Sequence, residues 1–191
     1  MPDLACYGMI IALFIETAQM SGNMVKRMFN VLTSLLCLLL FTATHCPATL
    51  LQADKVIVMK NEKRMILLMN GEILKCYKVA LGRGSTGPKT CLGDCKTPEG
   101  SYILNHRNGH SKFYRSIHVT YPNRTDIANA RKSGYNPGGD VMIHGLPDGF
   151  EELNEAHADI NWTKGCIAVS NREMDEIWRL VPDGTPIEIV P

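Results

Sequence analysis

The chain is divided into short apolar segments, and this division constrains its fold more than any other feature. Each segment has about the length of one β-strand, and Gly, Pro or Asn turns separate them. Asn70-Gly71 is the clearest of these signals and predicts a tight hairpin. The expected strands are residues 56–59, 65–68, 73–81, 101–104, 116–120, 141–144, 167–169 and 187–190.

Helix signals are sparse. Residues 172–181 have an acidic first turn and an apolar face, with Asn171 as the expected N-cap. Acidic residues 149–158 predict a short surface helix. A polar loop is expected between the strands 101–104 and 116–120. The sequence therefore predicts a mainly β domain, a sandwich or barrel, with one C-terminal helix and one short surface helix.

The N-terminus resembles an export signal. Lys26 and Arg27 precede an apolar run, 28–41, whose core is shorter than the roughly 20 residues that a membrane-spanning helix needs. We expect residues 1–53 to be an N-terminal extension and signal peptide, with cleavage near Ala53 and Met24 as an alternative start. An uncleaved leader that anchors the protein in the inner membrane is the alternative, and it would be the only contact with a membrane.

Residues 54–191 are expected to form one domain with an uneven charge distribution. Residues 54–132 carry 15 basic and 6 acidic side chains, whereas residues 133–191 carry 3 basic and 11 acidic ones. We interpret this asymmetry as mutual attraction between two halves of one fold. The basic residues are scattered and the protein is expected to be exported, so no nucleic acid partner is expected.

Cysteine spacing bears on redox state and metal binding. The expected domain contains Cys76, Cys91, Cys95 and Cys166. In an oxidising compartment Cys91 and Cys95 are close enough in sequence to pair, which would leave two thiols. No second closely spaced Cys or His pair is present, so no metal site is expected. Residues 82–87 match a dinucleotide fingerprint, but prolines and glycines follow where a helix is required, so we interpret them as a loop without a cofactor.

A thiol and an imidazole are the candidate catalytic groups. Cys166 follows the turn residue Gly165, and His144 ends an apolar strand beside Gly145. A free thiol has a pKa near 8.5, so a nucleophilic cysteine needs a base. A Gly145 carbonyl that orients the imidazole, with oxyanion donors at the Gly165 and Cys166 N–H groups, would complete an acyl-transfer site. The competing interpretations are packing roles for both residues, or another base: His106, His110, His118 or His157.

These motifs together resemble the L,D-transpeptidase (YkuD) family, and in particular its Gram-negative periplasmic members. The resemblance rests on His144-Gly145, on residues 163–167 (Thr-Lys-Gly-Cys-Ile) and on Asn171. Residues 93–102, 121–123 and 137–140 also match segments typical of the family. It implies a β-sandwich-like catalytic domain at 54–191, located in the periplasm, with Cys166 as nucleophile, His144 as general base and Gly145 as orienting carbonyl.

The resemblance also implies a substrate. Cys166 would attack a peptidoglycan tetrapeptide stem, release D-alanine and pass the acyl group to an amine, without a metal or organic cofactor. Lys164 and Ala168 depart from the family pattern, which leaves the acceptor open. The alternatives are an L,D-carboxypeptidase or amidase of the same family, a sortase-like enzyme and a non-catalytic wall-binding module. Residues near the cleft that have no assigned role are Tyr114, Arg115, His118, Trp162 and Thr163.

Overall fold

The computed structural model describes residues 22, 24–28, 30–32 and 51–191. The chain divides into two units, Met1–Thr49 and Leu50–Pro191. The described residues of the first unit are helical and exposed, and most of the predicted signal-peptide core, 28–41, lies outside the described residues. Within the described part of the chain, no helix combines the length and the apolar character needed to span a membrane.

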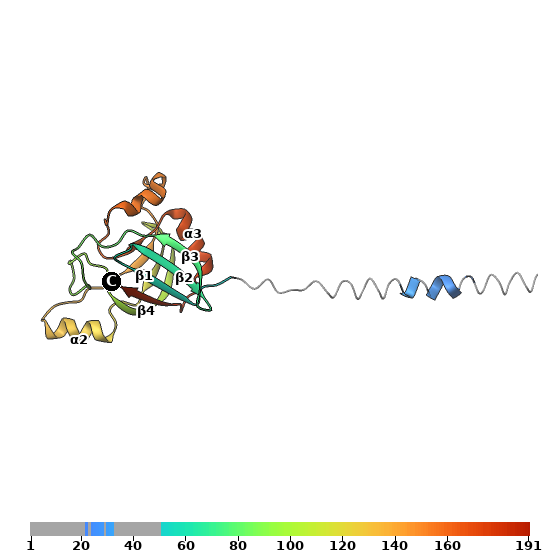
Figure 1. The fold of residues 1–191 in the computed structure, drawn as a ribbon, viewed down its shortest axis with the longest axis horizontal. Coiled ribbons are helices and arrows are strands. Elements are labelled where there is room, and N and C mark those ends of the chain that lie inside the picture. The colour runs from blue at the N-terminus through green and yellow to red at the C-terminus, as the bar shows by residue number, and fades with distance from the viewer. Residues whose placement is uncertain (1–21, 23, 29, 33–50) are drawn as a thin grey trace, which may run out of the picture. The chain divides into compact units, whose positions relative to one another are not determined.

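The second unit is built on one mixed sheet of eight strands in the order β3-β2-β1-β8-β4-β5-β6-β7 (Figure 1). Neighbouring strands are antiparallel except for two parallel pairs, β1 with β8 and β6 with β7. The predicted mainly β fold is confirmed. The strands are β1 (Lys55–Met59), β2 (Arg64–Met69), β3 (Glu72–Lys78), β4 (Gly100–Ser111), β5 (Tyr114–Val119), β6 (Met142–His144), β7 (Ile167–Ala168) and β8 (Pro186–Val190).

The first three strands form the predicted meander, and its Asn70-Gly71 hairpin turn is present. Both turn residues have positive φ, 54° and 83°, which is the requirement of a type I′ turn. After β3 the chain crosses to the opposite edge of the sheet. There Ala80 and Ala168 exchange two backbone hydrogen bonds of 3.0 and 2.8 Å, and Gly82 bridges to Thr163. The segment after β3 therefore connects the two edges of the sheet. It lies beside the residues that precede β7.

The prediction of a polar loop between 104 and 116 is wrong. Residues 104–111 continue β4 and pair with β5, while Gly100–Ile103 pair with β8. The pairing with β5 shifts register twice, between Asn105 and Arg107 and between Asn108 and Ser111. Such bulges interrupt the alternation of apolar and polar residues, which is why the pattern did not indicate a strand.

Three helices accompany the sheet: α2 (Arg124–Lys132), η1 (Glu151–Asp159) and α3 (Asn171–Leu180). The C-terminal helix is confirmed, with Met174 and Ile177 buried against the core. Its N-cap is Ser170 rather than Asn171, because Ser170 and Glu173 form a capping box. The predicted surface helix at 149–158 is the 3₁₀ helix η1, and α2 was not predicted because it buries only Ala130 and has no apolar stripe.

Ala53 belongs to the folded unit. Its side chain is 2% exposed within the core, and its N–H donates to the Leu180 carbonyl at 2.7 Å. Cleavage between Ala53 and Asp54 would remove both contacts. The folded unit therefore begins at or before Ala53.

Ion pairs connect the basic and acidic halves of the domain, as the charge pattern predicted. Of the six ion pairs among the described residues, four join a basic residue before 133 to an acidic residue after it. These four are Lys55–Glu188, Lys75–Glu176, Arg107–Asp183 and Arg115–Asp175.

Candidate active site

The two predicted catalytic residues lie on neighbouring parallel strands. His144 is the last residue of β6, and Cys166 directly precedes β7. The strands pair with Ile143 opposite Ile167, and both isoleucines are fully buried. Because side chains alternate between the two faces of a strand, His144 and Cys166 belong together on the opposite face. The parallel β6–β7 pair thus brings an imidazole and a thiol from separate segments to one surface.

The imidazole of His144 has a defined orientation. Its Nδ1 lies 2.7 Å from the Gly145 carbonyl oxygen. A carbonyl only accepts hydrogen bonds, so Nδ1 carries the proton and Nε2 keeps its lone pair. The ring is 3% exposed. This burial lowers the pKa of His144 more than the Gly145 carbonyl raises it, and nearby His157 lowers it further. At neutral pH the imidazole is therefore uncharged and able to take a proton at Nε2.

Asn171 fixes the turn that carries the Gly145 carbonyl. Its Oδ1 accepts the Leu146 N–H at 2.7 Å, while the Gly145 N–H donates to the Arg115 carbonyl at 3.2 Å. A Cβ at Gly145 would lie 2.5 Å from the same Oδ1. Any side chain at this position would displace the Asn171 amide and disturb its bond to the Leu146 N–H. Asn171 was predicted as a helix cap and as part of the family motif, but the cap is Ser170 and Asn171 bonds to the turn after β6 instead.

The thiol of Cys166 is partly buried and protonated at rest. Burial raises its pKa, the Met142 backbone and the Lys89 ammonium lower it less, and Asp140 adds to the rise. The thiol donates to the Asp140 carbonyl, with Sγ and oxygen 3.6 Å apart. A neutral thiol on the same strand face as a neutral imidazole suits general-base activation rather than a preformed thiolate–imidazolium pair.

Gly165 stands at the turn before Cys166, and the N–H groups of these two residues are the predicted oxyanion donors. The Gly165 N–H donates to Thr163 Oγ1 at 3.1 Å, so this group is already used within the loop. The Thr163 hydroxyl in turn donates to the Cys166 carbonyl at 2.8 Å. Gly165 has φ of 128°, and a Cβ there would lie 2.7 Å from the Lys96 carbonyl oxygen. Gly165 and Thr163 therefore shape the turn before the cysteine, and the Cys166 N–H remains the predicted oxyanion donor.

Comparison with known proteins agrees with this geometry. A family model described as the L,D-transpeptidase catalytic domain (YkuD) matches residues 53–189, most of the chain. The chain belongs to the YkuD family. YafK of Escherichia coli strain K12, a protein of the L,D-transpeptidase group, is 31% identical over 112 residues, which are 58% of this chain and 38% of YafK. The chain thus matches well under half of the length of this curated relative.

Solved structures place the YkuD domain among L,D-transpeptidase folds. The helical cell shape determining protein Pgp2 from Campylobacter jejuni is 28% identical with a TM-score of 0.55, and the match covers 72% of this chain and 47% of Pgp2. An L,D-transpeptidase fragment from Xylanimonas cellulosilytica shares the fold at 16% identity and a TM-score of 0.50, with 73% and 61% of the chains covered.

Two aromatic rings lie against the His144 ring. The Phe113 ring lies with its centroid 4.5 Å from that of His144, and the Trp162 ring lies 5.7 Å away. The two aromatic rings are 6.3 Å apart. Phe113 was missed, because it follows a bulged strand in a stretch that we interpreted as a polar loop. The sequence signal that could have identified Phe113 is an apolar side chain among polar neighbours.

The other suggested cleft residues make contacts elsewhere. The Tyr114 hydroxyl donates to Asp175 of α3 at 2.9 Å, and Arg115 forms an ion pair with the same carboxylate at 3.0 Å. His118 Nδ1 lies 2.9 Å from Asn105 Oδ1 on β4. These contacts hold α3 and β4 against β5. Lys164 is exposed, and Ala168 is fully buried in its bridge to Ala80.

The segment that contains Cys91 and Cys95 packs beside the site without a disulfide. All four cysteines of the described domain are free, so the predicted pairing is not present. The Asp94 carboxylate holds the loop instead. Burial acts to raise its pKa, but hydrogen bonds from the Lys89 ammonium and from the backbone N–H groups of the loop outweigh it and lower the pKa to about 2. Among residues 51–191, no group of His, Cys, Asp or Glu side chains is arranged to hold a metal ion.

Proposed function

We propose that this protein is a peptidoglycan L,D-transpeptidase that acts through a Cys166 thioester, with His144 as general base and the Gly145 carbonyl as its orienting group. The observation that carries the proposal is the shared face of His144 and Cys166 on β6 and β7, with Nδ1 of His144 bonded to Gly145 and Nε2 free to accept a proton. Membership of the YkuD family and the similarity to the cell shape protein Pgp2 support peptidoglycan as the substrate.

The first half-reaction forms the thioester. Nε2 of His144 takes the proton from Sγ, and the sulfur attacks the carbonyl at the L-centre of the stem diamino acid. The carbon–nitrogen bond to the terminal D-alanine breaks, and the imidazolium returns its proton to the leaving amine. The Cys166 N–H would stabilise the oxyanion, a contribution that is typically 10²–10³ in rate.

The second half-reaction releases the enzyme. An acceptor amine attacks the thioester, a new amide bond forms, and the sulfur leaves with the proton that the amine loses through His144. If water replaces the amine, the same steps give a carboxypeptidase or an amidase that trims stems or detaches a wall-linked protein.

The test is incubation of the purified domain with disaccharide tetrapeptides, followed by mass spectrometry. Cross-linked dimers with loss of D-alanine are expected, and they should vanish in the Cys166→Ala variant. His144→Ala should slow thioester formation by about 10²–10⁴ while the fold persists. Tripeptides alone would identify a hydrolase. Identical products from the active and Cys166→Ala proteins would leave a wall-binding module as the function.

We further propose that the protein is exported to the periplasm through its N-terminal leader, with the inner-membrane anchored form as the alternative. The basic pair Lys26 and Arg27 before an apolar run supports export. N-terminal sequencing of periplasmic protein tests this. A start close to Ala53 is expected, whereas a start at Met1 or Met24 would indicate an uncleaved leader.

A further inference from the structure

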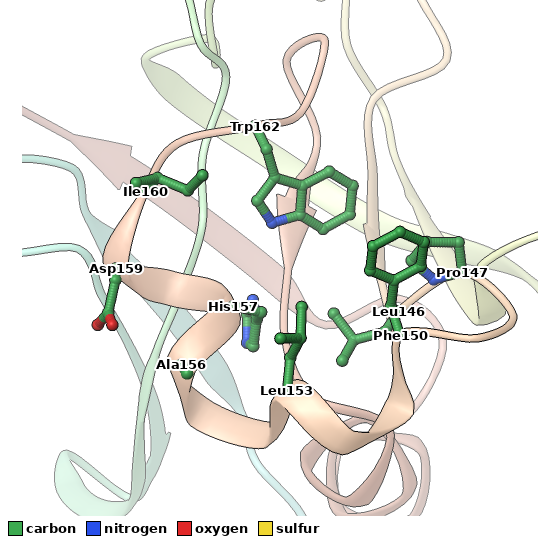
Figure 2. Close-up of a pocket in the computed structure, with 9 residues that line it drawn as sticks. All are labelled: Leu146, Pro147, Phe150, Leu153, Ala156, His157, Asp159, Ile160 and Trp162. Carbon is green, nitrogen blue, oxygen red and sulfur yellow. The ribbon is translucent and has the colours of Figure 1, made fainter.

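An apolar cavity of about 450 Å³ lies between η1 and the segment that follows β6 (Figure 2). Neither Cys166 nor His144 is among the residues that line it. Trp162 connects the cavity to the active site, because its ring lines the cavity and also contacts the His144 ring. The apolar lining is formed mainly by Leu146, Pro147, Phe150, Leu153, Ile160 and Trp162.

One polar side chain in this cavity has no partner. His157 is 3% exposed, and neither of its ring nitrogens makes a hydrogen bond among the described residues. Figure 2 shows its ring projecting from η1 into the cavity near Leu153, below Trp162. Buried polar groups in native proteins are almost always hydrogen-bonded, so an unpaired imidazole aimed into a cavity points to a ligand. A neutral imidazole offers one donor and one acceptor, which is the complement of a peptide amide.

The mouth of the cavity is apolar and acidic. Phe150, Leu153 and Ile160 are 53%, 46% and 68% exposed, an unusual cluster of large apolar side chains at the surface. Five exposed carboxylates lie in the same segment, 148–159, with Asp159 among the residues that line the cavity, and none of the five forms an ion pair within residues 51–191. Lys63 donates to the backbone carbonyl of Asp159 and not to its carboxylate. The carboxylates are Asp148, Glu151, Glu152, Glu155 and Asp159.

We propose that this cavity binds a basic, apolar segment of a polypeptide. An aromatic or branched aliphatic side chain occupies the cavity, a backbone amide of the segment pairs with His157, and a neighbouring Lys or Arg meets the carboxylates of η1. The volume lies within the range of ordinary ligand pockets and accommodates such a side chain. Cys166 takes no part in this binding, so the inference stands or falls independently of the proposed function.

The experiment measures peptide binding to the full chain carrying Cys166→Ala, through the fluorescence of Trp162. The protein has two tryptophans, so a Trp162→Phe variant assigns the signal. The probe is the blocked tripeptide Lys-Phe-Lys, with Lys-Ser-Lys and Glu-Phe-Glu as matched controls. The Lys-Phe-Lys peptide is expected to bind at least about 10-fold more tightly than either control, a difference of about 1.4 kcal/mol.

Two variants locate the binding. His157→Leu keeps an apolar side chain of similar size and should weaken Lys-Phe-Lys about 10-fold with no loss of thermal stability. The double variant Glu152→Lys, Glu155→Lys should weaken it similarly, whereas Glu72→Lys, at the end of β3 opposite to Lys78, should leave it unchanged. Equal binding of the acidic peptide, no binding of any peptide, or unchanged affinity in His157→Leu would each overturn the proposal.

Discussion

At the scale of single residues, the site depends on a turn with no space for a side chain. The Gly145 carbonyl orients His144, and Asn171 holds the next peptide unit through the Leu146 N–H. The two residues are neighbours because Gly145 has no Cβ. Asn171 is therefore a positioning residue for the imidazole, and it acts without contact with a reacting atom.

Asn171→Ala should reduce both stability and activity. Loss of the acceptor leaves the Leu146 N–H unpaired, which costs about 1–3 kcal/mol, and it frees the turn that orients His144. We expect activity to fall about 10-fold, mainly in kcat, as measured by thioester formation. Asn171→Asp keeps the acceptor and is the matched control. Activity of Asn171→Ala equal to that of the native protein would contradict this role.

Acid should destabilise the fold through two buried histidines. Burial lowers the pKa of both His144 and His157 below the ordinary value of 6.5. As the pH falls below 6.5, the unfolded chain binds protons before the folded chain does, so the stability present above pH 6.5 is progressively lost. Urea midpoints at pH 7.5 and 5.0 measure the loss. The His157→Leu variant should lose less stability between pH 7.5 and 5.0 than the native protein does. An identical loss in this variant would assign the effect to other groups.

The Cys166 thiol has the opposite effect on how the stability of the fold depends on pH. Because burial raises the pKa of Cys166 above its ordinary value of 9.0, the unfolded chain ionises first in alkali, and the stability contributed by the neutral thiol declines above pH 9. Cys166→Ala should remove this alkaline component.

At the scale of elements, local patterns predicted most strands and the C-terminal helix, but not the contacts between them. His144-Gly145 and Cys166 stand at the ends of short apolar strands, so their positions followed from the sequence. Phe113 and Asn171 act through partners far along the chain, and no local pattern encodes such contacts. The length of β4 was underestimated because its bulges interrupt the alternation of apolar and polar residues along the strand.

The start of α3 provides a test at this scale. Ser170 Oγ accepts the Glu173 N–H at 3.3 Å, and Glu173 Oε2 accepts the Ser170 N–H at 2.8 Å. Ser170→Ala should therefore destabilise the domain by about 1 kcal/mol in chemical denaturation. Asn171→Ala combined with Ser170→Ala should show more than additive loss of activity, because both residues lie where α3 meets the active site.

At the scale of the whole molecule, the folded unit begins at or before Ala53. A chain starting at Asp54 loses the buried methyl group of Ala53 and its hydrogen bond to Leu180. We expect such a chain to be about 1–2 kcal/mol less stable than one starting at Leu51, as measured by urea denaturation. A chain starting at Gln52 is the control and should match the longer one. Equal stability of all three would contradict a folded unit that begins at or before Ala53.

The bridge between Ala80 and Ala168 has a further consequence for the behaviour of the protein at high concentration. A strand whose backbone groups are unpaired on one side is a template for another chain, and β7, next to Cys166, would be such a strand. Ala80 pairs with both the N–H and the carbonyl of Ala168. A second copy of the chain therefore cannot form strand hydrogen bonds with Ala168. The segment that contains Cys166 is thereby protected from edge-to-edge aggregation.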